Sequence, residues 1–234
     1  MTAHCDRDGR DDPDGTLRIR LSLPEIDALC LKAARGAGYS WGVAEEASFA
    51  ARWLAARGLP GPAMLLAHLQ RFDGKGWDEI VPVVGDVWSA RKGGVLCALA
   101  VGSALSDRAD LPGNRSTDAL RIDGLASPML ILPFVQQNAR AQHANLSVCW
   151  GRYEAVLSEN GFTLAAEESL VDRDEPAVVV IRRVDRPARP TVAGADCLLE
   201  NATMRGLSAF AHRTYVPATA RSRAGAGAAS SDND

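Results

Sequence analysis

The order in which helix-like and strand-like patterns follow one another constrains the fold of this chain more than any motif. Helical patterns occupy residues 22–71, strand-like patterns dominate the middle, and a helical pattern closes the body at about residues 197–213. The regular alternation of strands and helices that a doubly wound parallel sheet requires is not seen. The sequence therefore predicts an α+β fold with N-terminal helices, a central antiparallel strand meander and a C-terminal helix.

The first two predicted helices carry clear boundary signals. Ser22 stands three residues before Glu25, the spacing at which the two side chains can each satisfy a free backbone N–H of the other residue. Glycines favour a helix end, and Ser40 is a suitable cap for a second helix. The stretch GAGYSWGVAEE, residues 36–46, is therefore expected to turn the chain from one helix into the next.

The middle of the chain carries the strand signals. In YEAVLSENGFTLAA, Asn160 and Gly161 lie between two strand-like runs, and this pair tolerates the positive φ angles of a two-residue type I′ hairpin turn. NLSVCW before this unit and AVVVIRR after it are expected to be neighbouring strands. Residues 94–107 fit either a helix or a buried strand, because short apolar runs do not distinguish the two. Residues 128–142 are predicted to form a helix.

Composition suggests one folded body with two different ends. Residues 1–16 are rich in aspartate and poor in apolar side chains, so we expect them to be disordered. Residues 218–234 form a Gly/Ala/Ser-rich tail. Between them, residues 17–217 show no composition break, and they are predicted to form a single α+β domain.

Charge and hydropathy exclude two classes of partner. The net charge is −3 and no dense Lys/Arg stripe is present, so the pattern of a nucleic-acid-binding protein is missing. The longest apolar runs are shorter than the roughly 18 to 20 residues needed to cross a bilayer. We therefore expect neither a nucleic-acid partner nor a membrane partner.

The cysteines indicate a reducing compartment. Their number is odd and their spacing is wide, which is not typical of a disulfide framework. The sequence opens without a charged and then apolar signal segment, so a cytoplasmic protein without disulfides is expected. The five residues are Cys5, Cys30, Cys97, Cys149 and Cys197.

The sequence lacks the common motifs for binding a dinucleotide, a phosphate group or a metal ion. The glycines at 36 and 38 lack the third glycine of a dinucleotide fingerprint and follow a predicted helix instead of a strand. Neither a phosphate-binding loop nor a HExxH or CxxC pair occurs, and the histidines are far apart. We expect no cofactor and no metal.

Residues 36–46 and their surroundings are the main candidate site. Glu45 and Glu46 fall near the start of the second helix, where one of them would act as a general acid or base. Cationic and aromatic side chains nearby would hold a small polar or carboxylate ligand. The alternative is that the acids merely stabilise the positive helix end while the tryptophans pack in the core. The proposed ligand-binding residues are Lys32, Arg35, Trp41 and Arg52.

Cys97 is the second candidate, as a nucleophile. It follows Gly93 and Gly94, whose backbone N–H groups could face an oxyanion. A thiol needs a base to become reactive, and His68 and His143 are the candidates for that role. The alternative is that Cys97 is a buried small hydrophobic residue.

Two stretches carry a resemblance to a known family. KAARGAGYSWGVAEEASFAARWLAARGLPG and FAHRTYVPATARSRAGAGAASSDND resemble a bacterial family catalogued only as a domain of unknown function. The resemblance spans nearly the whole chain and implies no activity. It implies that residues 36–46 and the tail are family features, and that the tail docks on the body.

These observations favour a role in small-molecule metabolism and leave open whether the protein is itself an enzyme or a subunit of one. The expected partner is a small polar metabolite. The alternative is a non-catalytic interaction subunit of a bacterial complex, whose partner is another protein or further copies of this chain.

Overall fold

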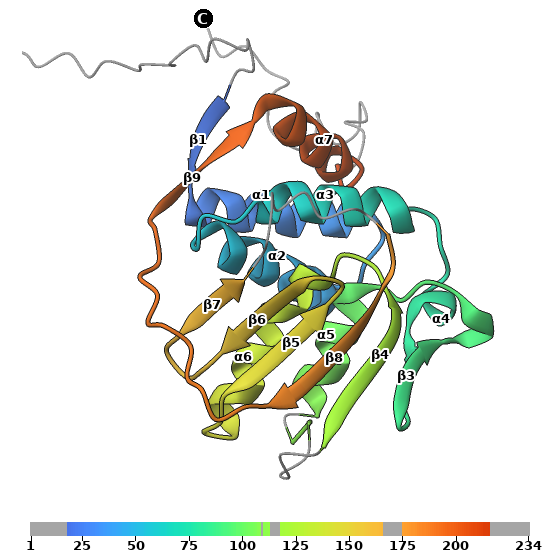
Figure 1. The fold of residues 1–234 in the computed structure, drawn as a ribbon. Coiled ribbons are helices and arrows are strands. Elements are labelled where there is room, and N and C mark those ends of the chain that lie inside the picture. Colours follow the sequence, from blue (N-terminus) through green and yellow to red (C-terminus); the bar gives the residue numbers. More distant parts are fainter. Residues whose placement is uncertain (1–17, 109, 113–117, 166–174, 216–234) are drawn as a thin grey trace, which may run out of the picture.

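The computed structural model describes residues 18–108, 110–112, 118–165 and 175–215, and these ranges form the α+β fold that the sequence predicts (Figure 1). The predicted disordered segment, 1–16, and the predicted tail, 218–234, lie outside the described residues. The single domain over residues 17–217 stays a prediction.

Helices α1 to α5 lie in the first half of the chain, α6 lies in the second half and α7 lies near the end of the described residues. Their bounds are α1 Leu23–Gly36, α2 Trp41–Ala55, α3 Gly61–Phe72, α4 Trp77–Ile80, α5 Ala98–Asp107, α6 Leu132–Ala141 and α7 Asn201–His212. Two short 3-10 helices are η1 Arg91–Gly93 and η2 Pro128–Ile131.

The strands form a large mixed sheet and a small separate ribbon. Their bounds are β1 Arg18–Ser22, β2 Pro82–Val83, β3 Val87–Ala90, β4 Ala119–Leu125, β5 Leu146–Trp150, β6 Tyr153–Leu157, β7 Phe162–Ala165, β8 Ala177–Arg183 and β9 Asp196–Glu200. The large sheet has the order β2-β3-β4-β8-β5-β6-β7. Strands β3 and β4 are parallel, and the other neighbours described in this sheet are antiparallel.

Strands β5, β6 and β7 are the predicted antiparallel meander. The next strand, β8, does not continue it but returns to pair with the far side of β5, and there it joins the meander to β4. The order of the strand-like patterns along the chain suggested instead that this strand would follow the others as the next strand of the meander. The position of β8 was decided by the buried faces of β4 and β5, which meet Val179 and Ile181 in one apolar cluster.

The predicted turn at Asn160 and Gly161 is wrong in type. Leu157 pairs with Phe162, so four residues connect β6 and β7, and neither Asn160 nor Gly161 has a positive φ angle. The two-residue hairpin lies instead between β5 and β6, where Gly151 has a φ of 52° at the first central position. A turn with that geometry requires glycine there, which is the local cause that sequence reading missed.

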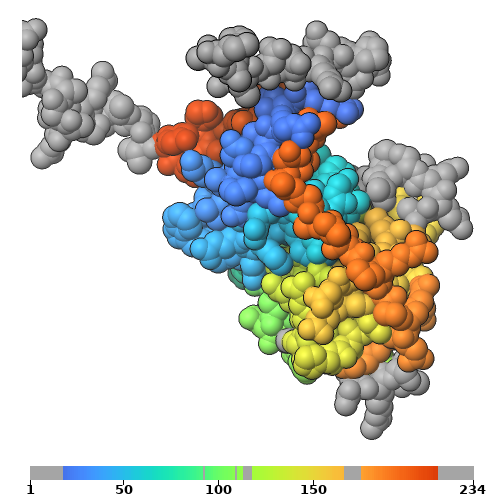
Figure 2. All heavy atoms as spheres, turned by 90° about the vertical axis from the view of Figure 1, so that its left-hand side faces the viewer, coloured from blue at the N-terminus to red at the C-terminus, as the bar shows by residue number. Residues whose placement is uncertain are grey.

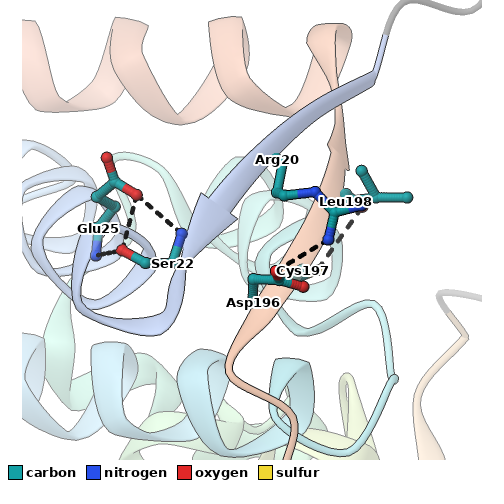
Figure 3. A network of polar contacts seen from close by, with 6 residues as sticks. All are labelled: Arg20, Ser22, Glu25, Asp196, Cys197 and Leu198. Atoms are coloured by element: carbon teal, nitrogen blue, oxygen red, sulfur yellow. Dashed lines mark hydrogen bonds and ion pairs between the residues drawn. The ribbon is translucent and has the colours of Figure 1, made fainter. Parts of the chain in front are cut away.

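The C-terminal helix starts later than predicted. Residues 196–200 pair with β1 in an antiparallel ribbon, so α7 begins only at Asn201. Figure 3 shows Arg20 of β1 reaching Asp196 of β9, with 2.9 Å between Nη1 and Oδ2. The pairing of the first and last described strands is a long-range contact, which local pattern cannot reveal.

The ambiguous segment at residues 94–107 contains a helix. Leu96 forms a bridge with Leu125, the end of β4, and α5 starts two residues later at Ala98. The helix predicted over residues 128–142 is present as η2 followed by α6.

Two apolar clusters hold the layers together. The first joins one face of the large sheet to α5 and α6, which lie behind the sheet in Figure 1. The second joins α1, α2, α3 and α7, the helical layer drawn above the sheet. Helices α2 and α5 contribute side chains to both clusters, so they connect the sheet to the helical layer.

The segment between β8 and β9 runs over the surface, and Figure 2 shows it as an orange band crossing from the strands to the helical layer. Among the backbone bonds that attach it, Phe162 N–H donates to Arg189 O at 2.9 Å, and Gly194 N–H donates to Ala56 O at 2.7 Å. The segment therefore connects the end of the sheet with α2.

The predicted helix start at Ser22 is confirmed. The Ser22 hydroxyl accepts from the Glu25 backbone N–H at 3.4 Å, and the Glu25 carboxylate accepts from the Ser22 backbone N–H at 2.8 Å (Figure 3). The Ser22 hydroxyl also donates to Glu25 Oε2 at 2.7 Å, and this bond, together with the one from the Ser22 backbone N–H, favours the ionised acid and holds the pKa of Glu25 below its usual value.

Within the described part of the chain, no helix has both the length and the apolar character needed to span a membrane. The cysteines described there are free thiols. They are Cys30, Cys97, Cys149 and Cys197.

The close approach of α1 to α7 gives a testable consequence. A Cβ added at Gly36 would lie 1.7 Å from the carbonyl oxygen of Phe210, so Gly36→Ala must push the helices apart. We expect this change to lower the free energy of unfolding by about 1 to 3 kcal/mol, measured by urea denaturation.

Gly42→Ala is the matched control, because a Cβ at Gly42 would meet no atom within 4 Å. It should leave stability unchanged or raise it by up to about 1 kcal/mol. Equal stabilities of the two variants would contradict the close packing of α1 on α7.

Candidate functional site

The chain from α1 to α2 forms a fixed corner, as the sequence predicts. Helix α1 ends at Gly36, and Gly38 has a φ of 95°, a conformation that side chains rarely adopt. The Tyr39 backbone N–H donates to Ala34 O at 3.2 Å, and the Ser40 hydroxyl caps α2 by accepting from the Val43 N–H at 3.5 Å. These bonds hold Tyr39 with its side chain buried at 7% exposure.

A pocket of about 360 Å³ lies against this corner. Half of its lining comes from the corner itself, and the rest comes from the end of α3, the loop after it, and α4. The Tyr39 and Trp77 rings meet edge to face, with 6.2 Å between centroids. The lining residues are Ala37, Gly38, Tyr39, Ser40, Phe72, Lys75, Trp77 and Ile80.

A fully buried thiol–imidazole pair lies directly behind the pocket wall. His68 Nε2 on α3 is 3.1 Å from Cys97 Sγ, and both residues are 0% exposed. The Tyr39 hydroxyl is 3.6 Å from the same sulfur. The other ring nitrogen, Nδ1, is 3.4 Å from the Ser127 hydroxyl. The imidazole is thus held on both sides, and Tyr39 separates the sulfur from the pocket.

Backbone contacts place these side chains. Cys97 is the N-cap residue of α5, and its N–H donates to the carbonyl of Ile80, a pocket residue, at 3.0 Å. Ser127 has a φ of 51°, in the left-handed region, at the turn that follows β4. The Phe72 ring lies 4.6 Å from the His68 ring, measured between centroids.

Burial keeps both members of the pair neutral. Loss of hydration raises the pKa of the Cys97 thiol to about 11, although backbone N–H groups of Ala100 and Leu99 and the Tyr39 hydroxyl oppose the shift. Loss of hydration lowers the pKa of His68 to about 3, and Arg71 adds to this effect. At neutral pH the closed site therefore holds a thiol and an uncharged imidazole.

The residues predicted from the sequence are spread over several places. Lys32 lines a different pocket, of about 330 Å³, between α1 and α7. Arg35 donates to the Tyr39 carbonyl, and its guanidinium lies 4.9 Å from the centre of the Trp41 ring. Trp41 is 62% exposed. Their proposed ligand-binding roles stay predictions.

The remaining predicted residues lie along α2. Arg52 pairs with Asp27 of α1, with 3.3 Å between Nε and Oδ1. Glu45 is exposed, and Glu46 is half-buried and hydrogen-bonded to Ser103 on α5. None of these residues lines the corner pocket. The acid or base role proposed for the two glutamates stays a prediction.

The sequence predicts Cys97 as a nucleophile with His68 or His143 as its base, and the structure brings Cys97 and His68 together. His143 is elsewhere, beside Asn145 and Ser158 in a separate pocket. Tyr39, Lys75 and Ser127 were not identified. Only Tyr39 had a usable signal, as an aromatic residue placed in a glycine-rich corner. Within the described residues, no three His, Cys, Asp or Glu side chains form a group that could hold a metal ion.

Comparison with known proteins identifies no activity. Residues 21–94 match the family model described as "Protein of unknown function (DUF3726)". This match confirms the resemblance expected for the first helices, and it contains all the residues that line the corner pocket. The C-terminal stretch quoted for the resemblance lies outside the matched residues. No curated protein matches the chain.

The solved structures that match include one of low identity. The crystal structure of malate dehydrogenase from Entamoeba histolytica matches with a TM-score of 0.42 and 11% identity, over 73% of this chain. The chain spans about half of that protein, 51% of its length. A likeness at this level supports no conclusion about activity.

The position of Glu46 predicts a pH effect on stability. Burial raises the pKa of Glu46 above 4.5, partly opposed by the hydrogen bond with Ser103 and strengthened by Asp107, and its Oε2 is buried without a partner. Between the unfolded and the raised folded pKa, the folded state binds more protons, so this group makes stability fall as pH rises. Glu46→Gln removes that loss.

We expect Glu46→Gln to raise Tm at about pH 8 and to leave it nearly unchanged at about pH 3, where the native side chain is protonated in both states. Glu45→Gln, at an exposed position on the same helix, is the control and should not show this pattern. The same Tm difference at both pH values would contradict the assignment.

Proposed function

We propose that the protein acts in small-molecule metabolism, as an enzyme or a subunit of one, and binds a small polar or carboxylate ligand in the corner pocket. The observation that carries this proposal is a pocket of ligand size at the predicted corner, with a buried thiol–imidazole pair directly behind its wall. Pockets with a mainly apolar lining and few polar groups are typical binding sites.

The lining indicates the chemistry of the ligand. Tyr39, Phe72 and Trp77 offer aromatic surface, and Trp77 is 44% exposed at the pocket. Lys75 has no carboxylate partner among the described residues, and its Nζ lies 5.9 Å from the Phe72 ring centre. An unpaired ammonium beside aromatic rings favours a small planar or apolar molecule that carries an anionic group.

The alternative, a non-catalytic interaction subunit, has a separate observation in its favour. The β1–β9 ribbon has only two strands among the described residues, so both of its outer edges are unpaired there. Leu198 on β9 is 52% exposed, and Val192 before it is 93% exposed. An open strand edge with exposed apolar side chains is suited to pairing with another chain. A cytoplasmic location remains a prediction under either reading.

Thermal shift measurements with a panel of small carboxylates, from acetate to benzoate and succinate, test the proposal. A compound at about 100 times its Kd would stabilise the folded protein by about 2.7 kcal/mol, or roughly 5 to 10 °C in Tm. We expect Lys75→Ala and Trp77→Ala to abolish the shift produced by the best carboxylate.

Lys32→Ala and Glu45→Ala are the matched controls, since neither residue lines the corner pocket. Both should keep the shift. Loss of the shift in Lys32→Ala would place the ligand between α1 and α7, and loss in Glu45→Ala would favour a site along α2. Absence of a shift with every carboxylate would refute the proposed ligand class.

A further inference from the structure

We propose that Cys97 and His68 are a nucleophile and its general base, and that the Tyr39 side chain closes them off from the corner pocket. They act on an electrophilic carbon of a ligand in that pocket, and this carbon is separate from the carboxylate group of the ligand. The thiol chemistry stands on the geometry of the pair. The class of substrate rests on the proposed function.

Three residues of the pocket wall each contact the pair. The Tyr39 hydroxyl contacts Cys97 Sγ at 3.6 Å, the Ile80 carbonyl accepts from the Cys97 N–H at 3.0 Å, and the Phe72 ring lies against the His68 ring. All three residues also line the pocket. A rotation of the Tyr39 side chain is therefore the shortest change that would connect the sulfur with a bound ligand.

The pair has the arrangement of an activated nucleophile. A base lies within hydrogen-bond reach of the thiol, and a third group, the Ser127 hydroxyl, holds the far side of the base. Cys97 also stands at the N-terminus of α5, a helix of 10 residues, whose backbone N–H groups favour a thiolate. Entry of a polar ligand would restore part of the hydration whose loss keeps the pair neutral.

The chemical step is balanced within the site. The S–H bond of Cys97 breaks as its proton passes to His68 Nε2, and a new bond forms between Sγ and the electrophilic carbon. The leaving group departs with its electron pair, and His68 then returns the proton to that group or to water. No oxidant or reductant is needed. Lys75 would hold the carboxylate of the substrate at the other part of the pocket.

The alternative is that the Cys97–His68 pair has a purely structural role as part of the packed core. Cys30 on α1 provides the comparison, because it is also 0% exposed and burial also raises the pKa of its thiol. Among the described residues it has no hydrogen bond with a histidine. Equal burial without a base makes Cys30 an internal control for both reactivity and unfolding.

Alkylation of the full chain by iodoacetamide near neutral pH, mapped by peptide mass spectrometry, tests the pair. We expect Cys97 to react faster than Cys30 by about 10-fold or more, and His68→Gln to lower the Cys97 rate by about 10- to 100-fold. Tyr39→Leu, which keeps apolar volume but removes the hydroxyl, should raise the Cys97 rate. The Cys30 rate must stay constant, since unfolding would raise both.

Iodoacetate tests the link to the pocket, since it carries a carboxylate on a similar electrophile. We expect Lys75→Met to lower the Cys97 rate with iodoacetate while leaving the rate with iodoacetamide unchanged. Both reagents release iodide and add a two-carbon group to the sulfur. They differ in that iodoacetate carries a negative charge, so a change in their relative rates reports on how Lys75 interacts with that charge.

A Cys97 rate no greater than that of Cys30 in the wild-type chain overturns the proposal, and so does an unchanged rate in His68→Gln. Fast alkylation of Cys97 with no carboxylate shift in Tm would refute the proposed ligand while leaving the nucleophile supported. A carboxylate shift with an inert Cys97 would do the reverse. The two proposals therefore fail by different measurements.

Discussion

The close approach of helix backbones through small side chains is the constraint on which the rest of the structure depends. Alanines of α1 and α2 are fully buried between these helices, and Gly36 lies beneath the carbonyl of Phe210. Gly61 stands in the same relation to Ala51, where a Cβ would approach its carbonyl oxygen to 2.2 Å. Because close-packed interiors transmit a change in spacing, a larger side chain at either glycine would displace the corner that carries Tyr39.

That spacing also explains why the candidate site is closed. Four segments meet at the Cys97–His68 pair: the corner, α3, the start of α5 and the turn after β4. Their packing removes water from the thiol and from His68, and the same dehydration makes the charged form of each unfavourable. The structure thus places a thiol beside an imidazole in an environment that favours the neutral form of each.

Local signals predicted the boundaries of the early helices well. The capping box at Ser22, the helix end at Gly36 and the cap at Ser40 each depend on backbone groups a few residues apart. The predictions were wrong where a strand far along the chain provides a hydrogen-bonding partner. Residues 196–200 became a strand because β1 offers them a ladder of hydrogen bonds, and β8 moved to the centre of the sheet because its buried face fits between β4 and β5.

For the candidate site, the amino-acid sequence by itself determined the corner between α1 and α2, since helix ends depend on residues that are close together in the chain. It also determined which reactive side chains are present. It led to Cys97 through the two glycines that precede it, and to His68 as one of two candidate bases. Only the tertiary structure decided that His68 and not His143 lies beside the thiol, that Tyr39 covers it, and that Lys32, Arg52 and the glutamates lie apart. The physical reason is that distances between side chains on different helices are set by packing of the whole core, which no local pattern records.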